Sequence, residues 1–155
     1  MTGIANRRCF EQVATQSLVA SHAERGRALC LALIDVDRFK QVNDGHGHGV
    51  GDQVLQVIAA MLSEHVRDED LAARLAGDEF VLLLRRIELT KASEICERVR
   101  RAVADYHWPA ISPGLAVTIS IGLAQSQPGD TLEALMHRSD VSMYQRKGAA
   151  KLRSV

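Results

Sequence analysis

Four carboxylates stand where two predicted strands end, and they are well suited to chemistry. Asp35 and Asp37 lie where an apolar run over residues 28–36 ends. Asp78 and Glu79 lie in the tight turn of a predicted hairpin. If that hairpin pairs beside the apolar strand, three or four carboxylates converge at one edge of a sheet. Hard oxygen ligands in that arrangement suit Mg²⁺ with a bound polyphosphate. The structural alternative is that acidic residues commonly end strands and fill turns.

The segment after Asp35 adds a candidate phosphate site. Asp37 is expected to cap a short helix whose first turn is residues 38–40. Free backbone N–H groups at such a helix start can hold phosphate oxygens, and the charge of Lys40 lies close to them.

A candidate base-recognition site follows, because Asn43 and Asp52 flank the glycine-rich residues 45–49. An Asn amide and an Asp carboxylate can both meet the edge of guanine, whose N1–H and N2–H₂ groups are donors. The competing interpretation is a solvated loop, with Asp52 in the first turn of the next helix. His46 and His48 have no third His or Cys close by, which argues against a metal site there.

Two further charged pairs stand at predicted helix ends. Arg67 and Asp70 form an R-x-x-D motif between a long helix and a strand. Lys147 and Lys151 lie one helical turn apart near the end of the last helix. Taken alone, the first pair is a helix-terminal arginine with an acidic neighbour, and the second complements the helix dipole.

Hydrophobic periodicity predicts the elements that must position these residues. Helices are expected after Asn6 as N-cap, after the glycine-rich stretch, around residues 92–103 and from Asp130. Strands are expected over residues 28–36, 71–75, 79–84 and 117–123. The order α-β-α-α-β-β-α-β-α predicts a single α/β (α+β) domain over residues 1–155.

Composition bounds the class of protein. The chain has 155 residues, of which 46% are hydrophobic and 25% charged, the balance of a soluble globular domain. Nineteen basic residues offset nineteen acidic ones, so no global field exists to hold nucleic acid or an anionic membrane. The three widely spaced cysteines, Cys9, Cys30 and Cys96, argue against a disulfide framework or a zinc site. With no signal peptide or membrane span in the sequence, we expect a cytoplasmic domain.

Taken together, these motifs resemble those of the GGDEF family, the diguanylate cyclases. Residues 35–44, DVDRFKQVND, resemble the family's D-x-D-x-F-K-x-x-N-D, and residues 45–52 continue it as x-x-G-H-x-x-G-D. The signature loop appears in RLAGDEF, residues 74–80, as an AGDEF variant. Residues 117–122 match V-T-x-S-x-G, and residues 2–8 resemble T-G-L-x-N-R-R. Five matches in family order over almost the whole chain are highly specific.

The resemblance implies a fold like the palm of nucleotidyl cyclases, with a central mixed, mainly antiparallel sheet of about five strands flanked by helices. It implies that two GTP molecules become cyclic di-GMP and two pyrophosphates, each 3′-hydroxyl attacking the α-phosphate of the other GTP. One domain holds one GTP, so a homodimer of facing domains is expected. Mg²⁺, with Mn²⁺ as an alternative, would stabilise the charge on the attacked and leaving oxygens.

The family pattern also implies a role for each site residue. Asp35 and Asp78 would bind the metal with the backbone carbonyl of Val36, and Glu79 would bind metal or help deprotonate the attacking hydroxyl. Guanine would be recognised by Asn43 and Asp52. The groups that would hold the phosphates are the backbone at Phe39 and Lys40 and the side chains of Lys147 and Lys151.

The resemblance further implies product inhibition. Arg67 and Asp70 fall at the family's inhibitory-site position, where R-x-x-D binds a stacked pair of product molecules. Arg98 matches the arginine that a neighbouring domain contributes to that site. An arginine can fork onto phosphate or guanine N7 and O6, and an aspartate can accept from the guanine edge.

Two departures from the family pattern motivate an alternative. Ala76 replaces the first glycine of the signature loop, where a methyl group intrudes and disfavours a positive φ. Ala150 and Lys151 replace a glycine and an arginine of the last motif, and lysine keeps the charge but loses the fork. The alternative is a catalytically silent GGDEF domain that senses GTP or cyclic di-GMP. A palm-type polymerase is a third interpretation, which the net charge of zero opposes.

Overall fold

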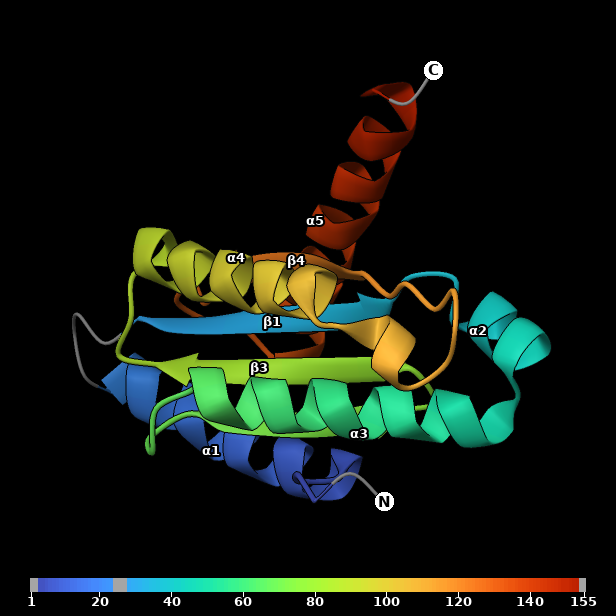
Figure 1. Cartoon of the computed structure of the whole chain (residues 1–155). Helices are drawn as coiled ribbons and strands as arrows, with labels where there is room; N and C mark the ends of the chain where they lie inside the picture. The colour runs from blue at the N-terminus through green and yellow to red at the C-terminus, as the bar shows by residue number, and fades with distance from the viewer. Residues whose placement is uncertain (1–2, 24–27, 154–155) are drawn as a thin grey trace.

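A four-stranded sheet with strand order β2-β3-β1-β4 forms the centre of the molecule (Figure 1). The computed structural model describes residues 3–23 and 28–153. The strands are β1 (Leu29–Val36), β2 (Leu71–Ala76), β3 (Glu79–Arg85) and β4 (Ile119–Gln125). Each neighbouring pair is antiparallel. The expected count of about five strands was therefore slightly high, and an isolated parallel bridge joins Ala5 and Ala73.

Helices cover both faces of the sheet, in the predicted element order. They are α1 (Arg7–Ala23), α2 (Phe39–His46), α3 (His48–His65), α4 (Leu89–Asp105), the short 3₁₀ helix η1 (Trp108–Ala110) and α5 (Leu132–Arg153). Figure 1 shows α3 and α4 on one face, with α1 and α5 on the other. None of the helices in the described part of the chain combines the length and apolarity needed to cross a membrane.

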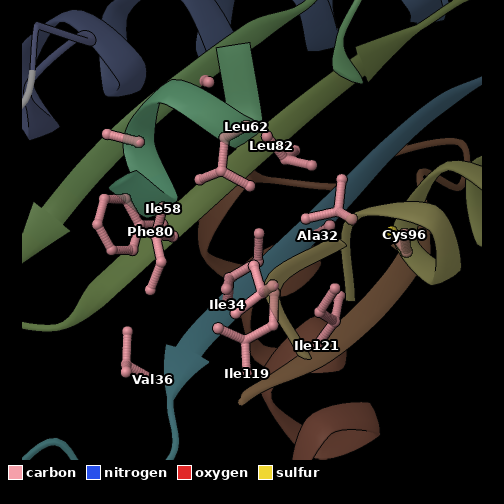
Figure 2. Close-up of a cluster of buried hydrophobic side chains, with 14 of the residues drawn as sticks. Ala32, Ile34, Val36, Ile58, Leu62, Phe80, Leu82, Cys96, Ile119 and Ile121 are labelled. Carbon is pink, nitrogen blue, oxygen red and sulfur yellow. The ribbon is translucent and has the colours of Figure 1, made fainter. Parts of the chain in front are cut away.

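Strand β1 is buried on both faces, as its continuous apolar run predicted. Ala32, Ile34 and Val36 point into the larger core, and Leu29 and Leu31 point into the smaller one. Figure 2 shows part of the larger core, where side chains of β1, β3, β4 and α3 meet. The two cores fix the strand between the helix layers by removing its apolar surface from water.

The helix caps show where local sequence signals hold and where they fail. Asn6 caps α1, accepting the backbone N–H of Cys9 at 2.9 Å, as predicted. The expected cap of α5 by Asp130 was wrong. Thr131 fills that role by accepting a backbone N–H at 3.1 Å. The Asp130 carboxylate instead accepts hydrogen bonds from the guanidinium of Arg138 at 2.7 and 2.8 Å. The spacing of capping residues in the sequence does not reveal this partner.

Helix α5 crosses β4 closely at Gly122. A Cβ atom at Gly122 would overlap the carbonyl oxygen of Ser139 and lie 2.5 Å from the backbone nitrogen of Met143. Ser139 is fully buried, and its hydroxyl donates to the carbonyl of Leu31 at 3.1 Å. Because the glycine of the V-T-x-S-x-G motif has no side chain, α5 can pack directly against β4 at this position.

We expect Gly122→Ala to lower the free energy of unfolding by about 2 kcal/mol, because the added methyl group forces α5 away from β4. The control is Gly148→Ala in α5, where an added Cβ atom would have open space around it. That variant should be unchanged or more stable by up to about 1 kcal/mol. Urea unfolding compares them, and equal midpoints for the two variants would contradict this account of the packing.

Candidate functional site

Three acidic residues stand at the same end of β1 and β3, because these two strands pair directly with each other. Asp35 lies opposite Glu79 in the antiparallel register, so both residues lie on the same face of the sheet. The backbone N–H of Val36 donates to the carbonyl oxygen of Asp78 at 3.2 Å. The main chain therefore places these residues at the same end of the paired strands β1 and β3, but the expected convergence of three or four carboxylate side chains is not seen in the described part of the chain.

The side chains of Asp35 and Asp78 are close enough to perturb each other. Burial raises the pKa of Asp78, and the hydrogen bond and charge of Asp35 raise it further, with a smaller contribution from Glu79. Two acids in this arrangement disfavour ionisation of both at once. A cation at this position would relieve that repulsion.

Lys147 from α5 supplies one positive charge to this cluster. Its Nζ atom lies 2.7 Å from Oδ2 of Asp35. Burial alone would lower the pKa of Lys147, but the hydrogen bond of Asp35 and the fields of Asp35, Asp37 and Asp78 raise it overall. Lys147 therefore stays ionised at neutral pH and partly balances the acids.

The donor set fits a hard divalent cation that also carries phosphate. Mg²⁺ in proteins is held by one or two carboxylates, with water and substrate phosphates completing its shell. Asp35 and Asp78 supply two adjacent carboxylates, and Val36 follows Asp35 at the strand end. Across residues 3–23 and 28–153 no three His, Cys, Asp or Glu side chains form a metal-binding group. The exposed side chain of Glu79 is therefore not gathered with the other two.

Asp37 does not cap α2, contrary to expectation. Arg38 occupies the N-cap position, with a left-handed φ of 53°, and its side chain makes no cap hydrogen bond. The Asp37 carboxylate instead accepts hydrogen bonds from the hydroxyls of Thr118 and Ser120. Partners more than eighty residues away along the chain outcompete the local cap, and no local pattern reveals them.

The helical hairpin α2–α3 carries the two residues expected to contact guanine. Gly47, with φ of 92°, joins the helices, so half-buried Asn43 on α2 and exposed Asp52 on α3 belong to one unit. A Cβ atom at Gly51 would overlap Oδ1 of Asn43, so that glycine makes room for the amide. Phe39, at the start of α2, packs against the larger core.

A contact outside the motifs anchors this hairpin. The Nδ1 atom of His46 and the hydroxyl of Ser112 are 2.7 Å apart, joining the end of α2 to the segment before β4. Sequence reasoning missed this role of His46, because its partner lies 66 residues away.

The signature turn does not require a positive φ at Ala76. Gly77 takes the left-handed conformation, with φ of 46°, whereas Ala76 ends β2 next to a bulge and has no positive φ. The Nε atom of Arg74 donates to the carbonyl of Gly77 at 2.9 Å and fastens the turn. The expected conflict between Ala76 and a positive φ was therefore wrong. A hollow of about 840 Å³ lies beside the turn, between it and the segment that begins α1.

The R-x-x-D motif lies at the other end of β2. The Asp70 side chain is fully buried and accepts from Nε and Nη2 of Arg67 and from the backbone N–H of Arg85, each at 3.0 Å. The hydrogen bond of Asp70 is the largest cause that raises the pKa of Arg67. Asp70 thus holds Arg67 in place and joins the segment before β2 to the end of β3.

Arg98 lies beside Arg67 within one chain. Both line a hollow of about 390 Å³ together with Arg86 and Lys91, four cations against the acids Glu88 and Glu94. Arg98 is thus placed at this hollow by α4 of the same chain, and the expected contribution of this arginine from a neighbouring domain stays a prediction. The remaining predicted residue, Lys151, lies near the end of α5, and its side chain is outside the described residues, as is Thr2 of the opening motif.

Comparisons with known proteins agree over almost the whole chain. The family described as "Diguanylate cyclase, GGDEF domain" matches residues 1–153. Diguanylate cyclase DgcP of Pseudomonas aeruginosa is 35% identical over 151 residues, covering 97% of this chain and 22% of DgcP. Response regulator PleD of Caulobacter vibrioides is 39% identical over 155 residues, covering 97% of this chain and 34% of PleD. The chain thus spans about a fifth to a third of the length of these two relatives.

Solved structures match the fold closely. The GGDEF domain of DgcB from Caulobacter crescentus, in complex with c-di-GMP, superposes with a TM-score of 0.89 at 29% identity. That match covers 96% of this chain and 88% of the DgcB chain. Diguanylate cyclase SiaD of Pseudomonas aeruginosa, in complex with its activator SiaC, gives a TM-score of 0.88 at 36% identity. It covers 96% of this chain and 56% of the SiaD chain.

The raised pKa of Asp78 predicts how stability depends on pH without metal. Because the folded state holds the Asp78 proton more tightly than the unfolded state, stability from this group falls as pH rises above the usual carboxyl range. Asp78→Asn should remove that loss and stabilise the metal-free protein at pH 7 by no more than about 1 kcal/mol, since the site is partly solvated. At pH 3 the advantage should vanish. Exposed Asp68→Asn is the control, and urea unfolding of metal-free protein is the measurement. A less stable Asp78→Asn at pH 7 would contradict the repulsion.

Proposed function

This chain belongs to the GGDEF family of diguanylate cyclases, and on that premise we propose that it condenses two GTP molecules into cyclic di-GMP and two pyrophosphates. The observation that carries the proposal is the pair of close carboxylates, Asp35 and Asp78, at the end of β1. A cluster of acids that one lysine only partly balances is suited to a cation that brings phosphates with it.

Asp35, Asp78 and the carbonyl of Val36 are the groups that would hold Mg²⁺, with Mn²⁺ as an alternative. When bound, the metal supplies charge stabilisation at the attacked and leaving oxygens. Glu79 stands opposite Asp35 on the neighbouring strand, where its exposed carboxylate can accept the proton of the attacking 3′-hydroxyl.

The remaining site residues would bind and orient GTP. The Asp52 carboxylate would accept hydrogen bonds from N1–H and N2–H₂ of guanine, and the Asn43 amide, which can donate and accept, would meet the same base edge. The backbone N–H groups at Phe39 and Lys40, in the first turn of α2, would bind the phosphates. Lys147 already stands 2.7 Å from Asp35 and would exchange that contact for a phosphate oxygen. Lys151 would add charge one turn further along α5.

Two facing domains are needed, since one site holds one GTP and each nucleotide must attack the other. The homodimer is therefore part of the proposal, and turnover per chain should rise with protein concentration until the dimer saturates. The domain itself needs neither nucleic acid nor membrane contact for this reaction, and we propose a cytoplasmic location.

The alternative is a silent domain that binds GTP or cyclic di-GMP without turnover. It was motivated by Ala76 and Lys151. Ala76 is exposed, lies at the end of a strand and does not have a positive φ. The idea that Ala76 distorts the signature turn is therefore weakened. The turnover assay below separates the two functions.

We expect GTP and Mg²⁺ to yield cyclic di-GMP, detected by chromatography, at protein concentrations that favour the dimer. Glu79→Gln should reduce turnover by at least about 100-fold, because it removes the proton acceptor while nearly preserving volume. The control is Glu64→Gln, which changes an exposed acid on α3. Near-normal synthesis by Glu79→Gln would show that its proposed role is wrong, and binding without any turnover by the wild type would favour the silent sensor.

We also propose that cyclic di-GMP inhibits the enzyme through the hollow shared by Arg67 and Arg98. Its cations suit phosphates and guanine edges, and it lies at the far end of β2 from Asp78, so a ligand there acts at a distinct site. Asp70 contributes by holding Arg67, since its own oxygens are already hydrogen-bonded.

Arg98→Ala should weaken product inhibition by about tenfold or more and leave uninhibited turnover almost unchanged. This variant is preferable to Arg67→Ala, which strips a buried carboxylate of its partner. The control is Arg101→Ala on the same helix, an exposed arginine paired with Glu97 at 3.2 Å. Rates measured across a cyclic di-GMP titration decide the matter, and identical inhibition curves for wild type and Arg98→Ala would place the inhibitory site elsewhere.

A further inference from the structure

Asp37 makes three hydrogen bonds with one distant segment of the chain. The Thr118 hydroxyl donates to Oδ2 of Asp37 at 2.7 Å, and the Ser120 hydroxyl donates to Oδ1 at 2.6 Å. The backbone N–H of Asp37 donates to the carbonyl oxygen of Thr118 at 2.9 Å. Each carboxylate oxygen therefore has its own hydroxyl donor, and both hydroxyls come from the chain at the start of β4.

These contacts extend the sheet beyond its last regular pair. The β1–β4 ladder ends at Val36 opposite Ile119, and Asp37 follows immediately. The next residue, Arg38, takes a left-handed φ of 53°, which non-glycine residues seldom adopt without support from surrounding structure. The contacts of Asp37 thus hold the chain at the point where β1 turns into α2.

The two acids of the D-x-D motif meet different partners on the same strand end. Asp35 faces the charge cluster, where Lys147 pairs with it at 2.7 Å and its carboxylate raises the pKa of Asp78. Asp37 also lies within the electrostatic reach of Lys147, but its two carboxylate oxygens are engaged by two neutral hydroxyls. This division separates a residue that meets the cation from one that holds the backbone.

We propose that Asp37 is a positioning residue, with Thr118 and Ser120 as its partners, and that it does not ligate the metal. The three residues fasten the end of β1 to β4 and so hold the Asp35 carboxylate and the Val36 carbonyl where the cation binds. They also fix the direction in which α2 leaves the sheet toward the phosphates. This inference rests on the proposed function, because it assumes that Asp35 and Val36 meet Mg²⁺.

Three variants separate positioning from ligation. Thr118→Val with Ser120→Ala removes both hydroxyls and leaves the Asp37 carboxylate in place. Asp37→Ala removes the carboxylate. Asp37→Asn preserves the shape, since its amide can accept from one hydroxyl and donate to the other. The matched control is Thr15→Val, which removes an exposed hydroxyl that donates within α1.

The measurements are kcat, KM for GTP, the Mg²⁺ concentration for half-maximal rate, and Mn²⁺ affinity by electron paramagnetic resonance. We expect the double hydroxyl variant and Asp37→Ala to lower kcat by at least about tenfold and to weaken Mn²⁺ binding, because small displacements of reacting groups are costly. KM should change by less than about threefold. Asp37→Asn should stay within about threefold of wild type in every measurement. Urea unfolding confirms that each variant is folded.

Two results would overturn the proposal. In the first, Asp37→Asn loses Mn²⁺ binding and turnover as fully as Asp35→Asn does, while the double hydroxyl variant keeps Mn²⁺ binding and turnover. That result would show that Asp37 is a metal ligand. Wild-type behaviour of both Asp37→Ala and the hydroxyl variant would make the contacts irrelevant to the site.

The Mn²⁺ titration keeps this test separate from the proposed function. If the wild type makes no cyclic di-GMP, the proposed function fails. The positioning role then stands if the hydroxyl variant and Asp37→Ala bind Mn²⁺ more weakly than wild type and Asp37→Asn does not. It falls if all four proteins bind Mn²⁺ alike.

Discussion

Repulsion between Asp35 and Asp78 is the constraint on which the rest of the site depends. The antiparallel register of β1 and β3 brings these acids together, and partial burial makes their charges costly. The fold offsets this cost with one lysine, Lys147, delivered by α5. That delivery in turn needs Gly122, where the helix lies against β4. Such a cluster of acids lowers the stability of the domain, so its presence points to a functional role, the binding of a cation with its phosphate ligand.

The short β2 strand separates two regions with different chemistry. At one end, the signature turn presents Asp78 beside β1, and Arg74 fastens the turn. At the other end, a buried Asp70 holds Arg67 at the rim of a hollow rich in cations. Strand β2 and its buried neighbour β3 lie between the two regions. A ligand bound near Arg67 can therefore influence the Asp78 site only through the sheet or through a second domain.

Sequence reasoning succeeded where a residue's environment is set by its neighbours along the chain. Periodicity predicted the element order, and the Asn6 cap needed only the next turn of helix. It failed where tertiary partners decide. Distant hydroxyls draw Asp37 away from α2, and an arginine eight residues on engages Asp130. The motif position of Arg98 was clear, but only the packing of α4 shows that it lies beside Arg67 of its own chain.

The most direct test of the central claim is thermal unfolding with and without Mg²⁺ and GTP together. If the acids form the cation site, the wild type should gain stability from the pair of ligands, by about 2.7 kcal/mol at a hundredfold excess over the dissociation constant. Asp78→Asn, which lacks one of the two charges, should gain far less. An equal gain in both proteins would contradict the account, because it would show that Mg²⁺ and GTP bind without the carboxylate pair.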